Sequence, residues 1–380
     1  MKSKLLPIAL LLLGVSILAG RAQKLSFNGQ VSGFHLSKIE SPWQTANSLR
    51  YIPELKWNHA LGKTWKFDAE ASANMDARLQ YTYGDSISGA FSLKPYRIWG
   101  RFSSERFEIR AGLQKINFGS ASMLRPLMWF DRMDPRDPLQ LTEGVYGLLG
   151  RYFFQNNANI WLWGLLPGKS VKGWEMLVSD RKMPEFGGRF QLPAGPGEIA
   201  ISGHFRRIAA KQPEPSFLSF TDPLPEYRVG IDGKWDLGPG VWFEGTYSWY
   251  SGSVSRSIET AMLTLGTDYT LPLGNGLTVM AEHFLYQLGR YNNPAAKSLN
   301  FTASSVTYPI NLTHSLSAMV FYNWTSNDWY RFINWRINLS HISLYLMAFW
   351  NPDTFDLYQN TGNSNLMAGK GLQILFVWNH

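Results

Sequence analysis

The stretch WKFDAEASANMDARLQYTY, residues 65–83, alternates apolar and polar side chains without a break. Its odd positions are Trp65, Phe67, Ala69, Ala71, Ala73, Met75, Ala77, Leu79, Tyr81 and Tyr83, and its even positions run from Lys66 to Thr82 and are all polar. A period of two is typical of a β-strand, because successive side chains leave opposite faces. Strands of globular proteins have about 5 to 6 residues, whereas this one would extend about 60 Å at roughly 3.3 Å per residue.

A closed barrel in a membrane explains so long a strand with one polar face. One face of each strand meets lipid and the other meets a wet channel, and closure leaves no unpaired edge in hydrocarbon. About 10 residues cross the bilayer when the strand is tilted. The rest of this strand is therefore expected to project beyond the bilayer, at Tyr81 and Tyr83.

The first residues, MKSKLLPIALLLLGVSILAGRAQ, have the pattern of a secretory signal peptide, with two lysines, an apolar run and small residues before the cleavage site. We expect residues 1–22 to be removed, with cleavage after Ala22. The chain has no cysteine, which excludes disulfides, thiolate metal sites and a lipid anchor at a cleavage-site cysteine. Loss of Lys2, Lys4 and Arg21 lowers the formal net charge from +8 to +5.

The rest of the chain divides into strand-like runs. They lie at about 24–38, 47–60, 63–83, 91–103, 105–117, 144–154, 157–167, 186–193, 197–209, 226–237, 240–251, 258–272, 276–288, 298–309, 313–324, 329–338, 340–350 and 368–379. Short connections follow the even-numbered runs and longer ones follow the odd-numbered runs, as in barrels with short periplasmic turns and longer external loops.

This order predicts an all-β fold, a transmembrane antiparallel β-barrel of about 18 strands, with 16 also possible, formed by residues 23–380 as a single domain. The abundance of aromatic residues, with 16 Trp, 17 Tyr and 23 Phe, suits the aromatic girdles of such barrels. A large soluble β-sandwich or β-helix is the less favoured alternative, because no fixed-length repeat is present.

Two neighbouring segments resemble known outer-membrane proteins. RAGLQKINFGSA at 110–121 and WFDRMDPRDP at 129–138 resemble the strand-then-loop segment of Gram-negative, Bacteroidota-type porin-like barrels, including alginate-export-like barrels. The resemblance implies a bacterial outer-membrane location, with outer-membrane lipid and the barrel-assembly machinery as partners. Such barrels usually end on an aromatic residue, whereas here Trp378 precedes Asn379 and His380.

If the apolar positions face lipid, charged side chains face the lumen. The candidate pore-lining residues are Lys66, Asp68, Glu70, Arg78, Arg97, Arg101, Arg110, Arg189, Arg206 and Arg228. Rings of arginine favour anions. We therefore expect a porin-like channel for passive diffusion of small hydrophilic solutes that are anionic or sugar-like. The alternative is a cross-strand ladder of opposite charges that simply fills a wet lumen.

Residues 118–143 form the least ordinary connection, because they combine apolar and charged side chains at high density. The candidate constriction residues are Arg125, Trp129, Phe130, Asp131, Arg132, Asp134, Arg136 and Asp137. Exposed apolar residues at this density need cover, which the segment finds by folding into the barrel or by packing over its own outer rim. In the first case Asp131, Asp134 and Asp137 are expected to face one basic patch of Arg97, Arg101 and Arg110. Ca²⁺ binding by these aspartates is a weaker alternative.

Other functions have less support from the residues. A barrel-embedded hydrolase needs a nucleophile, a base and an orienting group within reach, and the seven histidines are scattered without a recognised motif. A non-conducting scaffold for an outer-membrane protein partner, with 168–185 and 351–367 as docking surfaces, is the main alternative to a channel. We expect no cofactor, no metal and no nucleic acid, and a homo-oligomer is possible.

Overall fold

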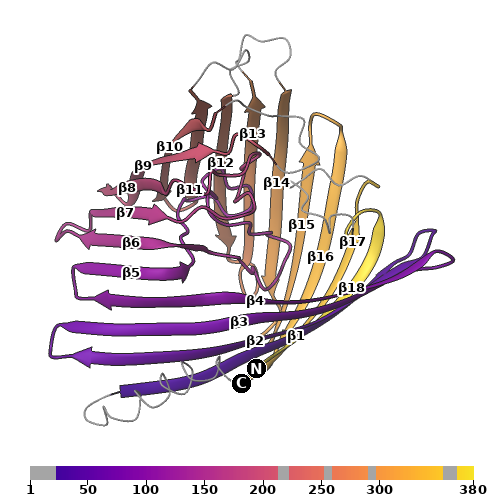
Figure 1. Ribbon diagram of the computed structural model, residues 1–380. Coiled ribbons are helices and arrows are strands. Elements are labelled where there is room, and N and C mark those ends of the chain that lie inside the picture. Colours follow the sequence, from indigo (N-terminus) through magenta and orange to yellow (C-terminus); the bar gives the residue numbers. More distant parts are fainter. Residues whose placement is uncertain (1–22, 213–221, 252–258, 290–296, 354–365) are drawn as a thin grey trace.

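The structure, a computed structural model, describes residues 23–212, 222–251, 259–289, 297–353 and 366–380. The predicted signal peptide at 1–22 lies outside these residues and stays a prediction. Eighteen antiparallel strands form one sheet that closes, because β1 pairs with both β2 and β18 (Figure 1). The predicted all-β barrel is thus confirmed, with eighteen rather than sixteen strands. Among the described residues no helix has the length and apolarity to span a membrane.

The strands follow one another around the barrel in chain order. Their bounds are β1 (Gln23–Lys38), β2 (Gln44–Leu61), β3 (Trp65–Thr82), β4 (Ser86–Ser103), β5 (Phe107–Gln114), β6 (Val145–Phe153), β7 (Asn159–Leu165), β8 (Glu185–Ala194), β9 (Gly197–Ile208), β10 (Leu224–Asp236), β11 (Gly240–Tyr250), β12 (Glu259–Leu271), β13 (Leu277–Leu288), β14 (Lys297–Pro309), β15 (His314–Asn323), β16 (Asp328–Asn338), β17 (Ile342–Trp350) and β18 (Lys370–Asn379). The largest differences from the predicted bounds are the earlier starts of β4 and β2 and the earlier end of β5.

The two ends of the barrel differ in their connections. The turn end carries the short connections after even-numbered strands, such as 62–64 between β2 and β3. The loop end carries the long connections after odd-numbered strands, including 115–144 and 166–184. At the loop end the tips of β1–β4 extend beyond the neighbouring strands (Figure 1), and Tyr83 there is 68% exposed.

The outer wall is apolar around the barrel. On β18, for example, Leu372, Ile374 and Phe376 are between 42% and 54% exposed, whereas the alternate residues Leu375 and Val377 face inward and are buried. A closed wall of exposed apolar side chains is stable in a bilayer and not in water.

The inner wall has two unlike halves. Charged side chains line β2–β11, whereas the inner faces of β14–β17 carry buried aromatic residues such as Phe301, Phe321, Phe332 and Phe349. The sequence analysis expected polar residues on the whole inner face. On β17 and β18 both faces are largely apolar, so alternation cannot tell which face meets lipid.

Gly112 on β5 marks a place where the wall requires glycine. Its φ is +121°, and a Cβ atom there would lie 2.1 Å from the carbonyl oxygen of Ile98 on β4. We expect Gly112→Ala to lower the free energy of unfolding by about 2 kcal/mol or more, because the strained backbone and the clash add. Urea unfolding in micelles measures the change. Gly203→Ala is the control, since no atom lies within 4 Å of its Cβ position; equal midpoints for both variants would contradict the prediction.

Candidate functional site

Segment 115–144 folds into the barrel and is held there by Glu282 of β13. The carboxylate of Glu282 accepts backbone N–H hydrogen bonds from Ser122, Met123 and Leu124 at 2.6, 2.9 and 2.7 Å. Glu282 is 1% exposed. Hydrogen bonds from several N–H groups stabilise a buried carboxylate. Of the two arrangements that the sequence left open, the structure has the inward one.

Glu244 of β11 is a second anchor for the same segment. Its carboxylate accepts hydrogen bonds from the backbone N–H groups of Ala121, at 2.9 Å, and Leu127. Ser120 donates to Asp232 of β10 at 3.1 Å. The sequence analysis identified neither glutamate as an anchor, because each is one polar residue among others on an alternating strand.

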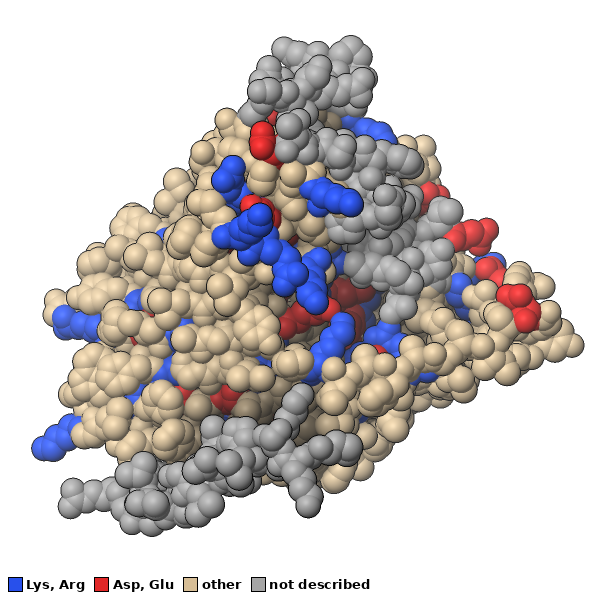
Figure 2. Space-filling view, viewed as in Figure 1, with Lys and Arg blue, Asp and Glu red and all other residues tan. Residues whose placement is uncertain are grey.

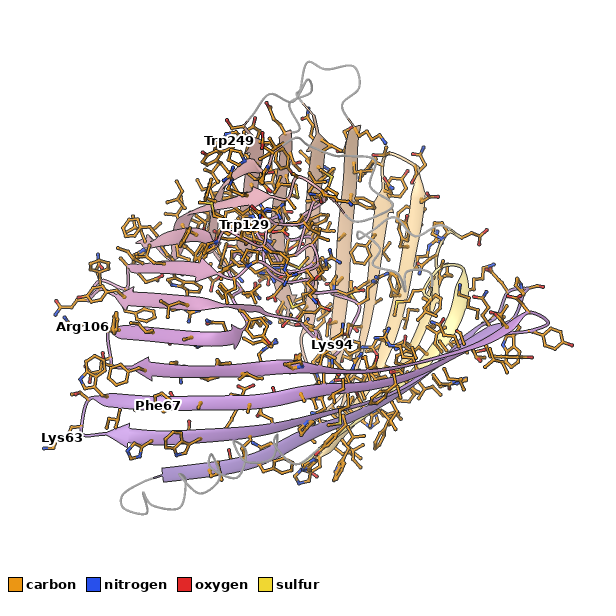
Figure 3. All side chains as sticks on the ribbon, viewed as in Figure 1. Lys63, Phe67, Lys94, Arg106, Trp129 and Trp249 are labelled. Carbon is orange, nitrogen blue, oxygen red and sulfur yellow. The ribbon has the colours of Figure 1, made fainter. Side chains whose placement is uncertain are left out.

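Apolar packing attaches segment 115–144 to two opposite parts of the inner wall. Near β5–β9, Leu127, Trp129 and Phe130 join a buried cluster that includes Leu149 and Trp163 of the wall. On the opposite side, Met123 and Leu124 pack into the aromatic inner wall of β13–β17. Figure 3 shows Trp129 in the barrel interior, far from Lys63 and Arg106 at the ends of the strands. The segment therefore bridges opposite walls and is packed like a protein core.

The charged residues of this segment mainly bond within it. Arg125 donates to Asn117 at 2.6 Å and to the Phe118 carbonyl at 2.9 Å. Arg136 donates to both oxygens of Asp134, at 2.7 and 2.5 Å. Asp137 and Arg132 are two further candidate constriction residues of this segment. The carboxylate of Asp137 accepts the backbone N–H of Leu139 at 2.9 Å, and the Nε and Nη2 atoms of Arg132 are buried without a hydrogen-bond partner.

A second segment, 166–184, also folds inward. The indole of Trp174 donates to the Arg125 carbonyl at 2.8 Å. Glu175 pairs with Arg206 at 3.0 Å and with Arg228 at 3.1 Å. This segment therefore covers the inner wall of β9 and β10 and separates it from the lumen.

Three expected pore-lining arginines point inward but do not face water. Arg206 is 0% exposed and Arg228 6%, and both pair with Glu226. Arg189 is 5% exposed and pairs with Asp232 at 2.5 Å. They hold the inward segments, and a solute moving through the lumen would not contact them.

The charged wall that stays partly exposed is that of β2–β6. The side chain of Arg78 is 32% exposed and that of Lys56 is 42% exposed. Asp76 accepts from Arg78 at 2.5 Å and lies 3.5 Å from Arg50. Figure 2 shows charged side chains of both signs gathered near the centre of the viewed face, with further charged side chains at its edges. Lys66, near the turn end of β3, is exposed, and Glu70 pairs in register with Lys56.

An arginine cluster occupies this wall at β4–β6. The carboxylate of Glu108 lies 3.0 Å from Arg110, 3.7 Å from Arg101 and 3.6 Å from Arg151. Arg101 also pairs with Asp68 at 2.7 Å. Sequence alone does not predict Arg151 as a pore-lining residue, because the run at 144–154 alternates poorly. We call Arg101, Arg110 and Arg151 the arginine cluster.

Two tryptophans border the arginine cluster. The guanidinium of Arg110 lies 4.8 Å from the ring centre of Trp99, and that of Arg151 lies 3.8 Å from Trp161. Among the residues that the structure describes, the Nε atoms of Arg110 and Arg151 have no hydrogen-bond partner. A guanidinium that lies over an indole ring is attracted to the ring face, which helps to fix its position and leaves its outer side for an anion.

Arg97 lies apart from the cluster and holds the end of segment 115–144. Its guanidinium donates to the carbonyls of Thr142 and Glu143 at 3.0 and 3.1 Å. None of the three aspartates expected to face the patch pairs with the arginine cluster in the part of the chain that the structure describes. The sign of charge across the lumen is therefore arranged differently from the expectation, with Glu108 and Asp68 opposing the arginines from the wall itself.

Asp131 is the exceptional carboxylate of the segment. It is 3% exposed, and both of its oxygens are buried with no hydrogen-bond partner in the described part of the chain. Burial raises the pKa of Asp131 to about 6, against the opposing effect of Lys115, Arg97 and Arg125. The charged form is therefore costly in the folded state.

Asp131→Asn should stabilise the protein at alkaline pH. Because the folded-state pKa is raised, this group stabilises the fold below about pH 4, and that contribution is lost as the pH rises through about 6. We expect a gain of up to about 3 kcal/mol at pH 8 and a weaker pH dependence, measured by urea unfolding at several pH values. Asp134→Asn, which removes an ion pair with Arg136, should give no gain; a gain equal to that of Asp131→Asn would contradict the assignment.

The chain is similar to known proteins in fold and not in sequence. No protein-family model matches the chain, and no curated protein matches it. The anion-selective porin from Comamonas acidovorans is 10% identical with a TM-score of 0.51, over 94% of this chain and 100% of that one. Acinetobacter baumannii OccAB1 is 8% identical with a TM-score of 0.58, over 94% and 96%. Pseudomonas aeruginosa OccK2 (OpdF) in complex with glucuronate is 8% identical with a TM-score of 0.56, over 94% and 96%. The fold is that of bacterial outer-membrane porins.

Proposed function

We propose that the protein is a porin-like channel of the bacterial outer membrane that lets small hydrophilic anions, including sugar acids, diffuse through passively. The observation that carries the proposal is the arginine cluster, which lies on a charged part of the inner wall that the inward segments leave partly exposed. Three guanidinium groups face the two carboxylates of Glu108 and Asp68, so the local charge is positive. A positive field in a narrow low-dielectric passage enriches anions.

The comparisons agree with this direction. One similar barrel is described as anion-selective and another as a complex with glucuronate. A sugar acid presents a carboxylate, which the guanidinium of Arg110, held over the ring of Trp99, can bind. The same proposal includes assembly of the barrel by the outer-membrane assembly machinery. It also includes a homo-oligomer formed through the apolar outer wall.

Planar-bilayer recording in a KCl gradient tests the proposal. We expect a reversal potential that shows a higher permeability for chloride than for potassium. We also expect added glucuronate to reduce the current. A cation-side reversal potential would reject anion preference while leaving a channel.

A non-conducting scaffold remains the alternative, because two segments fold into the lumen. Of its expected docking surfaces, 168–185 folds inward, and 351–367 lies mostly outside the described residues. The absence of conductance even after deletion of 122–138 would favour a scaffold. For the lesser alternative, a hydrolase, His204 is 4% exposed between Glu185 and Trp163, so it offers a substrate no access.

A further inference from the structure

Arg331 is a charged residue on the outer wall of the barrel. On β16 the inward residues Tyr330 and Phe332 are 0% and 3% exposed, whereas Trp329 and Ile333 are 46% and 39% exposed on the outside. Arg331 shares the parity of the outward pair. A cation on a lipid-facing wall is costly unless it reaches polar groups at the interface.

Aromatic rings and a second cation surround Arg331. Its guanidinium lies 5.7 Å from the ring centre of Trp329 and 5.9 Å from that of Trp350. Strand register places Trp350 opposite Arg331 on one side and opposite Lys370 on the other. Lys370 has the parity of the outward residues of β18. Arg331, Trp350 and Lys370 therefore form one outward row across β16, β17 and β18, which we call the outer row.

The outer row lies near the loop end of the wall. Trp350 is the last residue of β17 and Lys370 the first of β18. Tyr322 and Trp324 lie close by and form an aromatic contact, and Tyr322 also contacts Trp329. A belt of Trp and Tyr marks the boundary between hydrocarbon and headgroups.

The positive charge of the outer row is incompletely balanced. Glu40 lies 3.2 Å from Lys370, but the two side chains are 40% and 64% exposed, so water screens the pair. Among the described residues, no carboxylate pairs with the guanidinium of Arg331, although it is flanked by rings. Its fork of N–H donors therefore points to an anion from outside the chain.

We propose that the outer row binds the phosphate of a glycolipid in the outer leaflet. A guanidinium matches phosphate oxygens in a bidentate geometry, Lys370 adds a second positive charge, and the indole of Trp350 lies between them at the level where acyl chains begin. This inference concerns the lipid contact and does not depend on conduction. Each cation near anionic headgroups contributes about fivefold in affinity.

Native mass spectrometry of the full-length mature protein in detergent tests this proposal, with diphosphoryl lipid A and its dephosphorylated form as probes. For Arg331→Gln with Lys370→Gln we expect the apparent Kd for the diphosphoryl lipid to rise at least about tenfold. The matched control is Arg336→Gln with Lys56→Gln, which removes two positive charges from the inner face, Arg336 lying on the same strand as Arg331. The control should change the Kd by less than about twofold.

Several results would overturn the proposal. Equal binding of the dephosphorylated lipid, an equal loss in the control, or unchanged binding in the outer-row variant would each do so. A shift from oligomer to monomer with unchanged lipid binding would show instead that the row contacts a second copy. Arg331→Lys, which keeps the charge but not the bidentate fork, should give an intermediate loss, and it covers the case in which the double variant fails to assemble.

Discussion

Replacing Glu244 and Glu282 together by Gln should raise the single-channel conductance several-fold and make the current noisy. These carboxylates accept five backbone N–H hydrogen bonds from segment 115–144. In each Gln one acceptor oxygen becomes an N–H₂ group that faces those donors. Hydrogen bonds to a charged group contribute about 1.5 to 3 kcal/mol each, so the inward fold should lose its fixed position.

A control and a second measurement make this expectation specific. Glu198→Gln changes a glutamate of β9 that bonds with Gln191, so its conductance should match the unaltered protein. Trypsin should cut the double variant faster after Arg132 and Arg136, because a released segment exposes its backbone. Unchanged conductance and unchanged proteolysis would show that apolar packing alone holds the segment.

Replacing Arg101, Arg110 and Arg151 together by Gln should abolish the anion preference, moving the reversal potential in a salt gradient to zero or to the cation side. Asp68 and Glu108 then remain without their partners, so the local charge changes from positive to negative. Substitutions on the lumen side tune selectivity without disrupting the lipid-facing wall. Heat-modifiable migration in gels should therefore show that the barrel still folds.

A variant of Arg97 distinguishes the effect of the inward segment's position on the current from the effect of the arginine cluster on ion selectivity. The sequence places it with Arg101 and Arg110, but its bonds to Thr142 and Glu143 predict that Arg97→Gln alters noise and conductance more than selectivity. Arg106→Gln, in a short turn outside the lumen, should change neither. An unchanged reversal potential in the triple variant, with conductance intact, would remove the arginine cluster from the permeation path.

The sequence alone predicted the barrel, a strand number of about eighteen with sixteen left open, and the parity of short and long connections. Local physics suffices for this, because alternation along one strand and the turn residues at its ends do not depend on distant partners. The stretch at 65–83 shows the principle, since its single unbroken alternation already requires lipid on one side and water on the other.

Only the tertiary structure decided which inner residues meet water. Closure of the sheet brings β5 opposite β13, so that Glu282 meets Ser122 across 160 positions of the chain. The same closure buries Arg206 and Arg228 under segment 166–184 and Arg189 beside Phe118 of segment 115–144, whereas Arg151 joins Arg101 and Arg110 at a partly exposed wall. A polar residue on an alternating strand carries no sign of what will cover it. That depends on contacts between parts of the chain that are distant in sequence, and such contacts exist only once the barrel has closed around its own loops.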